Sequence, residues 1–186
     1  TMNQLGMLID LSHCSRLTTL QAIEQSKRPC AITHAGCKAL FPTARNKTDD
    51  EIRAVARKGG YFGVFNMSLW LTDQHTTSID DVVRHIDYAV KLAGIDHVGF
   101  GSDGPVTAST STPEVALQGM RGYYERNKGL PGAETMPYHV NVTELNSVNR
   151  LERLAHALGK RGYSDDAIEK VVGGNIARVL GSVLSS

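Results

Sequence analysis

Three polar side chains in this sequence each follow a short apolar run. His13 follows residues 6–12, His34 follows a second run about 20 positions later, and Asp103 follows a third run that begins at residue 97. Imidazole and carboxylate groups are common zinc ligands. Because the carboxyl ends of strands in a parallel βα fold converge on one face, these side chains predict a metal site at one rim.

Each of these residues also has a simpler interpretation. A single histidine at a strand end is more often a hydrogen-bonded structural residue than a ligand, but two histidines and an aspartate at equivalent positions favour the metal site. Asp103 could instead cap a helix or a turn. The cysteines are predicted to be small buried hydrophobic residues rather than ligands or disulfide partners: Cys14, Cys30 and Cys37.

Composition excludes several classes of protein. The chain has 186 residues, of which 41% are hydrophobic and 21% charged, as in an ordinary globular protein. A formal charge of +1 with scattered Lys and Arg gives no basic patch for nucleic acid. No apolar stretch approaches the roughly 20 residues of a membrane span. We therefore expect a soluble protein, cytoplasmic or periplasmic, with its compartment and any homodimer left open.

Short apolar runs alternate with amphipathic stretches along the first part of the chain. The predicted strands cover residues 6–12, 29–34, 60–66 and 97–103, and the predicted helices between them cover about 15–27, 49–58 and 78–93. Thr48 and Glu51 form a capping box that sets the start of one helix, and Gly94 ends another. This alternation predicts an α/β fold with a parallel sheet.

The remaining residues are predicted to form an insert at 105–146, with a helix near 114–127, and three closing helices near 147–161, 165–172 and 174–184. We expect 1–186 to be a single domain. About four βα units make half of an eight-stranded TIM-type barrel, which normally needs about 250 residues. The expected architecture is therefore the C-terminal half of a (β/α)8 barrel plus C-terminal helices, within a longer protein.

Several segments together resemble the membrane (renal) dipeptidase family of zinc peptidases. They are Gly6 to His13, Thr33-His34, Arg45-Asn46 with Asp49-Asp50, Gly59-Gly60, Asp87 to Asp103, and Arg161 to Asn175. The resemblance runs from about residue 5 to 181. It implies a metal-dependent hydrolase barrel that cleaves dipeptides with two zinc ions.

The resemblance implies a role for each candidate residue. His13 and His34 correspond to the histidines that hold the second zinc, Arg45 to the arginine that binds the substrate's terminal carboxylate, and Asp103 to the aspartate that transfers protons. A planar guanidinium suits a carboxylate, although a loop arginine is often only a surface residue. His139, on the insert expected to cover the rim, is a further candidate for substrate binding. We expect His85 and His156, inside helices, to be solvated or packing residues.

Two departures from the family pattern stand out. The ligands of the first zinc, a His-x-Asp pair and a bridging carboxylate, are expected before residue 1, so this chain would only partly ligand one ion. The usual Asp-Phe-Asp-Gly is replaced by Asp103-Gly104-Pro105-Val106. Two alternatives therefore stay open: a non-catalytic fragment or scaffold without a complete dinuclear site, and another metal-dependent amide hydrolase.

Overall fold

The computed structural model describes residues 1–72, 77–109 and 141–184, together with positions 115, 118, 121, 122 and 125. Its regular elements are, in chain order, η1 (Asn3–Leu5), α1 (Arg16–Gln25), β1 (Ala31–Ala35), α2 (Asp49–Arg57), β2 (Tyr61–Val64), η2 (Ser68–Trp70), α3 (Ile79–Ala93), η3 (Ile95–His97), β3 (Val98–Phe100), η4 (Thr143–Leu145), α5 (Arg150–Lys160), α6 (Asp165–Glu169), η5 (Lys170–Gly174) and α7 (Asn175–Leu184). The predicted helix near 114–127 and most of the insert lie outside the described residues.

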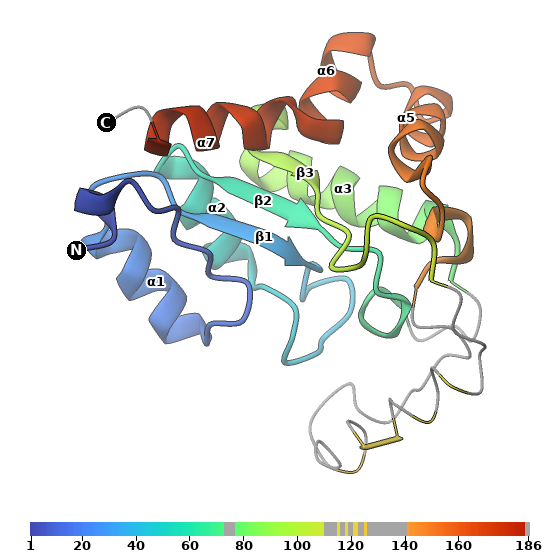
Figure 1. The fold of residues 1–186 in the computed structure, drawn as a ribbon, viewed down its shortest axis with the longest axis horizontal. Helices are drawn as coiled ribbons and strands as arrows, with labels where there is room; N and C mark the ends of the chain where they lie inside the picture. The colour runs from blue at the N-terminus through green and yellow to red at the C-terminus, as the bar shows by residue number, and fades with distance from the viewer. Residues whose placement is uncertain are drawn as a thin grey trace.

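The three strands form one parallel sheet in the order β1-β2-β3. Figure 1 shows all three running in the same direction, with α2 between β1 and β2 and α3 between β2 and β3 along the chain. The parallel α/β fold predicted from the alternating pattern is confirmed. Its consequence is that the loops after β1, β2 and β3 leave the sheet at one edge.

The prediction of a first strand over residues 6–12 is wrong in this structure. Only Asp10 is paired, through an isolated parallel bridge to Ala31, with Leu11 N donating to Ala31 O at 2.8 Å and Ala31 N donating to Ile9 O at 2.9 Å. The physical reason is that this segment pairs with β1 on one side and, within the described part of the chain, with no strand on the other. The apolar run therefore follows β1 without a full hydrogen-bond ladder.

Helix boundaries follow their capping residues. The side chain of Glu51 accepts a hydrogen bond from Thr48 N at 2.9 Å, which completes the predicted capping box of α2. Asp81 accepts from Ser78 N in the same way at the start of α3, and Gly94 ends that helix with a φ of 85°. These local hydrogen bonds explain why the predicted starts of α2 and α3 are confirmed.

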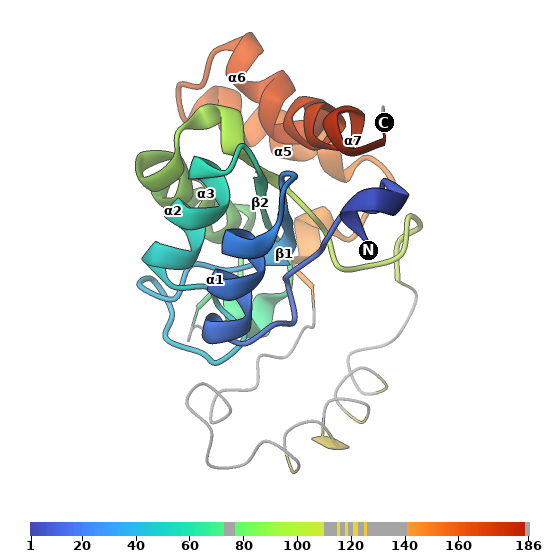
Figure 2. The ribbon, with the colours of Figure 1, turned by 90° about the vertical axis from the view of Figure 1, so that its left-hand side faces the viewer.

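The sheet is covered on both faces. Figure 2 shows α2 and α3 on one side and α7 on the other. The larger core lies under α2 and α3 and includes Ile32, Ile52, Val55, Phe62, Val64, Ile86 and Val98. A smaller core of Ala31, Tyr61 and Val179 lies under α7. Within the described residues, no helix is both long and apolar enough to cross a bilayer.

Candidate metal and substrate site

His13 and His34 meet at the carboxyl edge of the sheet. Their Nε2 atoms lie 3.0 Å apart, with ring centroids separated by 5.0 Å. Asp103, in the loop after β3, places Oδ1 3.7 Å from His34 Nε2. Three side chains that are far apart in sequence therefore converge at one rim, as the strand-end positions predicted.

Asp103 reaches this position through an uncommon backbone conformation. Its φ is 54°, and it is the non-glycine residue with positive φ in the described part of the chain. Aspartate tolerates this left-handed region better than most residues, although the conformation carries some strain. The turn directs the Asp103 carboxylate back toward His34 instead of continuing along the strand.

Arg45 lies across the two histidine loops. Its Nη1 donates to Ser12 O at 2.8 Å, its Nη2 donates to His34 O at 2.9 Å, and Nη2 also lies 3.4 Å from His13 Nε2. The stacked rings of Phe65 and Trp70 support the guanidinium, whose carbon lies 5.4 Å and 5.6 Å from their centroids. Arg45 thus joins the segments that carry both histidines, a role that its sequence context did not reveal.

The surroundings of His34 favour its neutral form, because they lower its pKa. Burial lowers the pKa of His34 and Arg45 lowers it further, while the nearby Asp103 carboxylate raises it; the net shift is downward. A neutral imidazole is the form that binds a metal ion.

Sequence reasoning missed Asp10, which hydrogen-bonds to Thr33, the residue before His34. Asp10 Oδ1 accepts hydrogen bonds from Ser12 N and Thr33 N, both at 3.1 Å, and from Ser12 Oγ at 2.6 Å, while Oδ2 accepts from Thr33 Oγ1 at 2.7 Å. Burial raises the pKa of Asp10, but these hydrogen bonds outweigh burial and the net pKa is lowered. The signal that could have found it is a carboxylate within an apolar run.

A buried ion pair holds the backbone of Cys14, the residue after His13. Lys47 Nζ lies 3.3 Å from Glu51 Oε1, with both side chains 3% exposed, and donates to Cys14 O at 2.7 Å. Burial lowers the pKa of Lys47, and the Glu51 carboxylate opposes that shift. The pair fixes the backbone next to His13 and was not predicted.

The spacing of the two histidine nitrogens fits zinc, but the ligand set is incomplete. Two nitrogens each about 2.1 Å from a tetrahedral zinc ion lie about 3.4 Å apart, close to the observed 3.0 Å between the Nε2 atoms. In residues 1–72, 77–109 and 141–184, however, no group of three or more His, Cys, Asp or Glu side chains is arranged to hold a metal ion. The described residues thus offer a partial ligand set. His139 lies outside them, so its predicted role stays a prediction.

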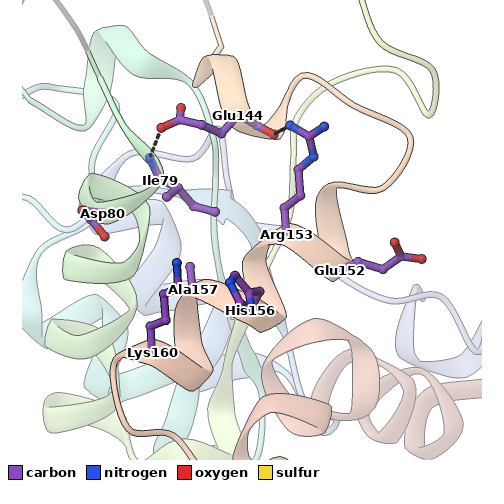
Figure 3. A pocket seen from close by; sticks show the side chains of 8 residues that line it. All are labelled: Ile79, Asp80, Glu144, Glu152, Arg153, His156, Ala157 and Lys160. Carbon is purple, nitrogen blue, oxygen red and sulfur yellow. Dashed lines mark hydrogen bonds between the residues drawn. The ribbon is translucent and has the colours of Figure 1, made fainter.

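A separate groove of about 580 Å³ lies between the start of α3 and α5. Figure 3 shows Glu144 bridging it, accepting a hydrogen bond from Ile79 N through its carboxylate while its backbone oxygen accepts one from Arg153. Both acidic and basic side chains line it. None of His13, His34, Arg45 and Asp103 lines the groove, so it is distinct from the rim site.

Comparison with known proteins identifies the family of the chain. The model of the membrane dipeptidase family, peptidase family M19, matches residues 1–112, and the chain belongs to this family. Dipeptidase ataJ of Aspergillus terreus is 32% identical over 96% of this chain, and Dipeptidase tcpJ of Claviceps purpurea is 28% identical over 98%. The chain spans 36% of the length of each of these two relatives.

Solved structures share the fold. An amidohydrolase from Pseudomonas aeruginosa superposes with a TM-score of 0.81 at 28% identity, covering 100% of this chain and 55% of that one. The probable dipeptidase PvdM from the same organism superposes with a TM-score of 0.75 at 22% identity, covering 99% of this chain and 52% of that one, which supports the fold alone.

Proposed function

We propose that this chain is the C-terminal half of a (β/α)8 barrel, organised as one domain with an insert at 105–146, in a zinc-dependent dipeptidase. The single observation that carries the proposal is the approach of His13 Nε2 to within 3.0 Å of His34 Nε2 beside Asp103, in a chain of the membrane dipeptidase family. His13 and His34 would hold part of one zinc ion. Ligands from outside this chain would complete a two-zinc centre.

Each side chain has a distinct task in this proposal. Zinc, when bound, polarises the peptide carbonyl and makes water a nucleophile at neutral pH. Asp103 accepts the proton of the attacking water on its carboxylate and delivers it to the departing amine. Arg45, with five N–H donors on one planar group, binds the free carboxylate of a dipeptide while it joins the Ser12 and His34 loops. His139 is proposed as a further substrate contact.

The proposal is tested on the full-length protein that contains this chain. His34→Ala should lose bound zinc and dipeptide hydrolysis together, whereas Asp103→Asn should keep zinc and lose turnover by about 10²-fold or more. Metal content by atomic absorption and dipeptide hydrolysis are the two measurements. His156→Ala, an exposed histidine of α5, is the matched control and should change neither. Full activity in His34→Ala would refute the proposed site.

A second candidate reaction is the hydrolysis of a different amide. It is favoured by the likeness to the Pseudomonas aeruginosa amidohydrolase, at 28% identity over the whole of this chain. Both reactions need the same water activation but differ in the group that Arg45 binds. Hydrolysis of N-capped dipeptides and of dipeptide amides separates them, because only a dipeptidase that uses Arg45 should require the free C-terminal carboxylate.

A further inference from the structure

A chain of hydrogen bonds links the Asp10 carboxylate to the His34 ring. Thr33 Oγ1 lies 2.7 Å from Asp10 Oδ2 on one side and 2.8 Å from His34 Nδ1 on the other. Asp10 is held in place by the backbone N–H groups of Ser12 and Thr33, which both donate to its Oδ1. The opposite nitrogen of the same ring, Nε2, is the one that faces His13 and Asp103.

The number of protons available in the Asp10–Thr33–His34 series fixes the direction of each of its hydrogen bonds. An ionised carboxylate has no proton to donate, and a threonine hydroxyl has one. The Thr33 hydroxyl must therefore donate to Asp10 Oδ2, which leaves its lone pairs to accept from His34. His34 then carries its proton on Nδ1, and its Nε2 presents a lone pair.

We propose that Asp10 and Thr33 are positioning residues that fix His34 in the Nδ1–H tautomer, so that Nε2 faces the rim as a ready metal ligand before any metal binds. The inference rests on the proposed function only in taking His34 as a ligand. The tautomer itself is a property of the metal-free protein. Outer hydrogen bonds of this kind orient a histidine ligand and raise its basicity.

The two histidines are supported unequally. His34 is partly buried, and two of its groups are hydrogen-bonded. Its ring Nδ1 contacts Thr33 Oγ1, and its backbone N–H donates to Ser12 Oγ at 3.1 Å. His13 is exposed, and within the described part of the chain its Nδ1 makes no hydrogen bond. His13 Nε2 lies 3.0 Å from His34 Nε2 and 3.4 Å from Arg45 Nη2, which can only donate. His34 is therefore the preorganised ligand and His13 the one that adjusts.

The tautomer is measured in the full-length metal-free protein labelled with ¹⁵N-histidine, at about pH 8, where a neutral ring is expected. The His34 signal is assigned by its loss in His34→Gln. We expect the Nδ1–H pattern in the wild type. In Asp10→Asn, the amide oxygen can keep the hydrogen bonds of Oδ1, and the amide nitrogen can take the place of Oδ2 and donate to Thr33. The hydroxyl then donates to His34 Nδ1, and the proton should move to Nε2.

Variants of Thr33 distinguish the effect of its hydroxyl hydrogen bonds on the tautomer from the effect of its packing. Thr33→Val should give mixed tautomers, and Thr33→Ser should restore the Nδ1–H form. Thr43→Val is the control for the same substitution, because Thr43 is buried and its hydroxyl has no hydrogen-bond partner in the described part of the chain. An Nε2–H wild type, or an Asp10→Asn variant with the wild-type tautomer, would overturn the inference.

Zinc affinity, measured by competition with a chelator, tests the consequence of the tautomer. Asp10→Asn and Thr33→Val should bind zinc about 10- to 100-fold more weakly, with Thr33→Ser and Thr43→Val near the wild type. Equal affinity in the wild type and Asp10→Asn would overturn the positioning role while leaving the proposed function. A wild-type protein that binds no zinc would overturn the proposed function, whereas the tautomer measurement would still stand.

Discussion

Arg45 is the residue through which substrate binding and metal binding are expected to be coupled. It donates to the backbone carbonyls of Ser12 and His34, so its removal loosens both histidine loops as well as the proposed carboxylate contact. Arg45→Ala in the full-length protein should raise KM for dipeptides more than it lowers kcat, because substrate and transition state share the contact. It should also weaken zinc binding.

Steady-state kinetics and zinc competition check this prediction together. Arg45→Lys should recover little, since a point charge cannot reach two carbonyls in the fixed geometry of a guanidinium. Arg16→Ala is a suitable control, because Arg16 is an exposed partner of Asp50 outside the rim site. An unchanged KM in both Arg45 variants would remove Arg45 from the substrate site.

Glycines let the strand ends approach the carbonyl of Thr33. A Cβ added at Gly63 or at Gly101 would lie well inside van der Waals contact of Thr33 O. We expect Gly63→Ala to lower the free energy of unfolding by about 1–3 kcal/mol and to weaken zinc binding, because Thr33 must move. Gly181→Ala in α7 meets nothing within 4 Å and should instead stabilise the protein by about 0.5–1 kcal/mol. Urea denaturation of both variants provides the comparison.

At the scale of elements, His85 joins α3 to two loops that leave the sheet at the site edge. It is fully buried, accepts from Cys37 N at 2.9 Å through Nδ1, and donates to Leu71 O at 2.9 Å through Nε2. We expected His85 to be solvated or a packing residue; the structure places it in the core as a hydrogen-bonded link. Burial lowers the pKa of His85 to about 4, although the hydrogen bond to Leu71 opposes this.

This buried histidine predicts a pH dependence of stability. The unfolded chain takes up the His85 proton near pH 6.5, whereas the folded protein does so only near pH 4, so acid favours unfolding between these values. The contribution of neutral His85 to the free energy of unfolding is fully present above about pH 6.5. The free energy of unfolding should fall by on the order of 3 kcal/mol as the pH drops to 4. Urea denaturation across this range should show a flatter profile for His85→Gln than for the wild type. His156→Gln, at an exposed position of α5, should keep the wild-type slope.

Local signals in the sequence predicted more of the elements than of the hydrogen bonds between them. Capping residues Thr48 and Ser78 set helix starts that the structure confirms, because a cap acts within one turn. Residues 6–12 fail as a strand because a ladder depends on neighbours that an apolar pattern cannot specify. The meeting of His13, His34 and Asp103 was predictable from strand direction. The Asp10–Thr33–His34 chain was not, because hydroxyl-mediated contacts leave no periodic spacing.

For the whole molecule, the partial ligand set predicts the behaviour of this chain when it is produced alone. Two zinc ions that share a substrate carbonyl lie about 3.5–4 Å apart and need more ligands than His13 and His34 supply. The 186-residue chain by itself should therefore lack dipeptidase activity even with excess zinc, while the full-length protein should have it. Loss of orientation alone can cost several kcal/mol of the roughly 7–11 kcal/mol that positioning contributes.

A dipeptide hydrolysis assay on both proteins, with Asp103→Asn in the full-length protein as the inactive reference, checks the expectation. Zinc content distinguishes the enzyme from the alternative of a non-catalytic scaffold. An assembled enzyme should hold two ions per site, whereas a scaffold should hold fewer. Robust turnover by the 186-residue chain would show that the remaining part of its relatives' length is dispensable or that the metal ligands are misassigned.

The contacts of α7 have a consequence for the order in which the protein can fold. Arg28, just before β1, donates to Val183 O at 2.9 Å across 155 residues, and Asn175 donates to Val98 O at 2.8 Å. A nascent chain emerging from the ribosome has thus delivered all three strands long before the helix that covers Ala31 and Tyr61 exists. Contacts between such distant residues slow folding and leave apolar surface open in the interval. During synthesis, the face of the sheet that carries Ala31 and Tyr61 stays uncovered until α7 has been made, and it is open to aggregation in that interval.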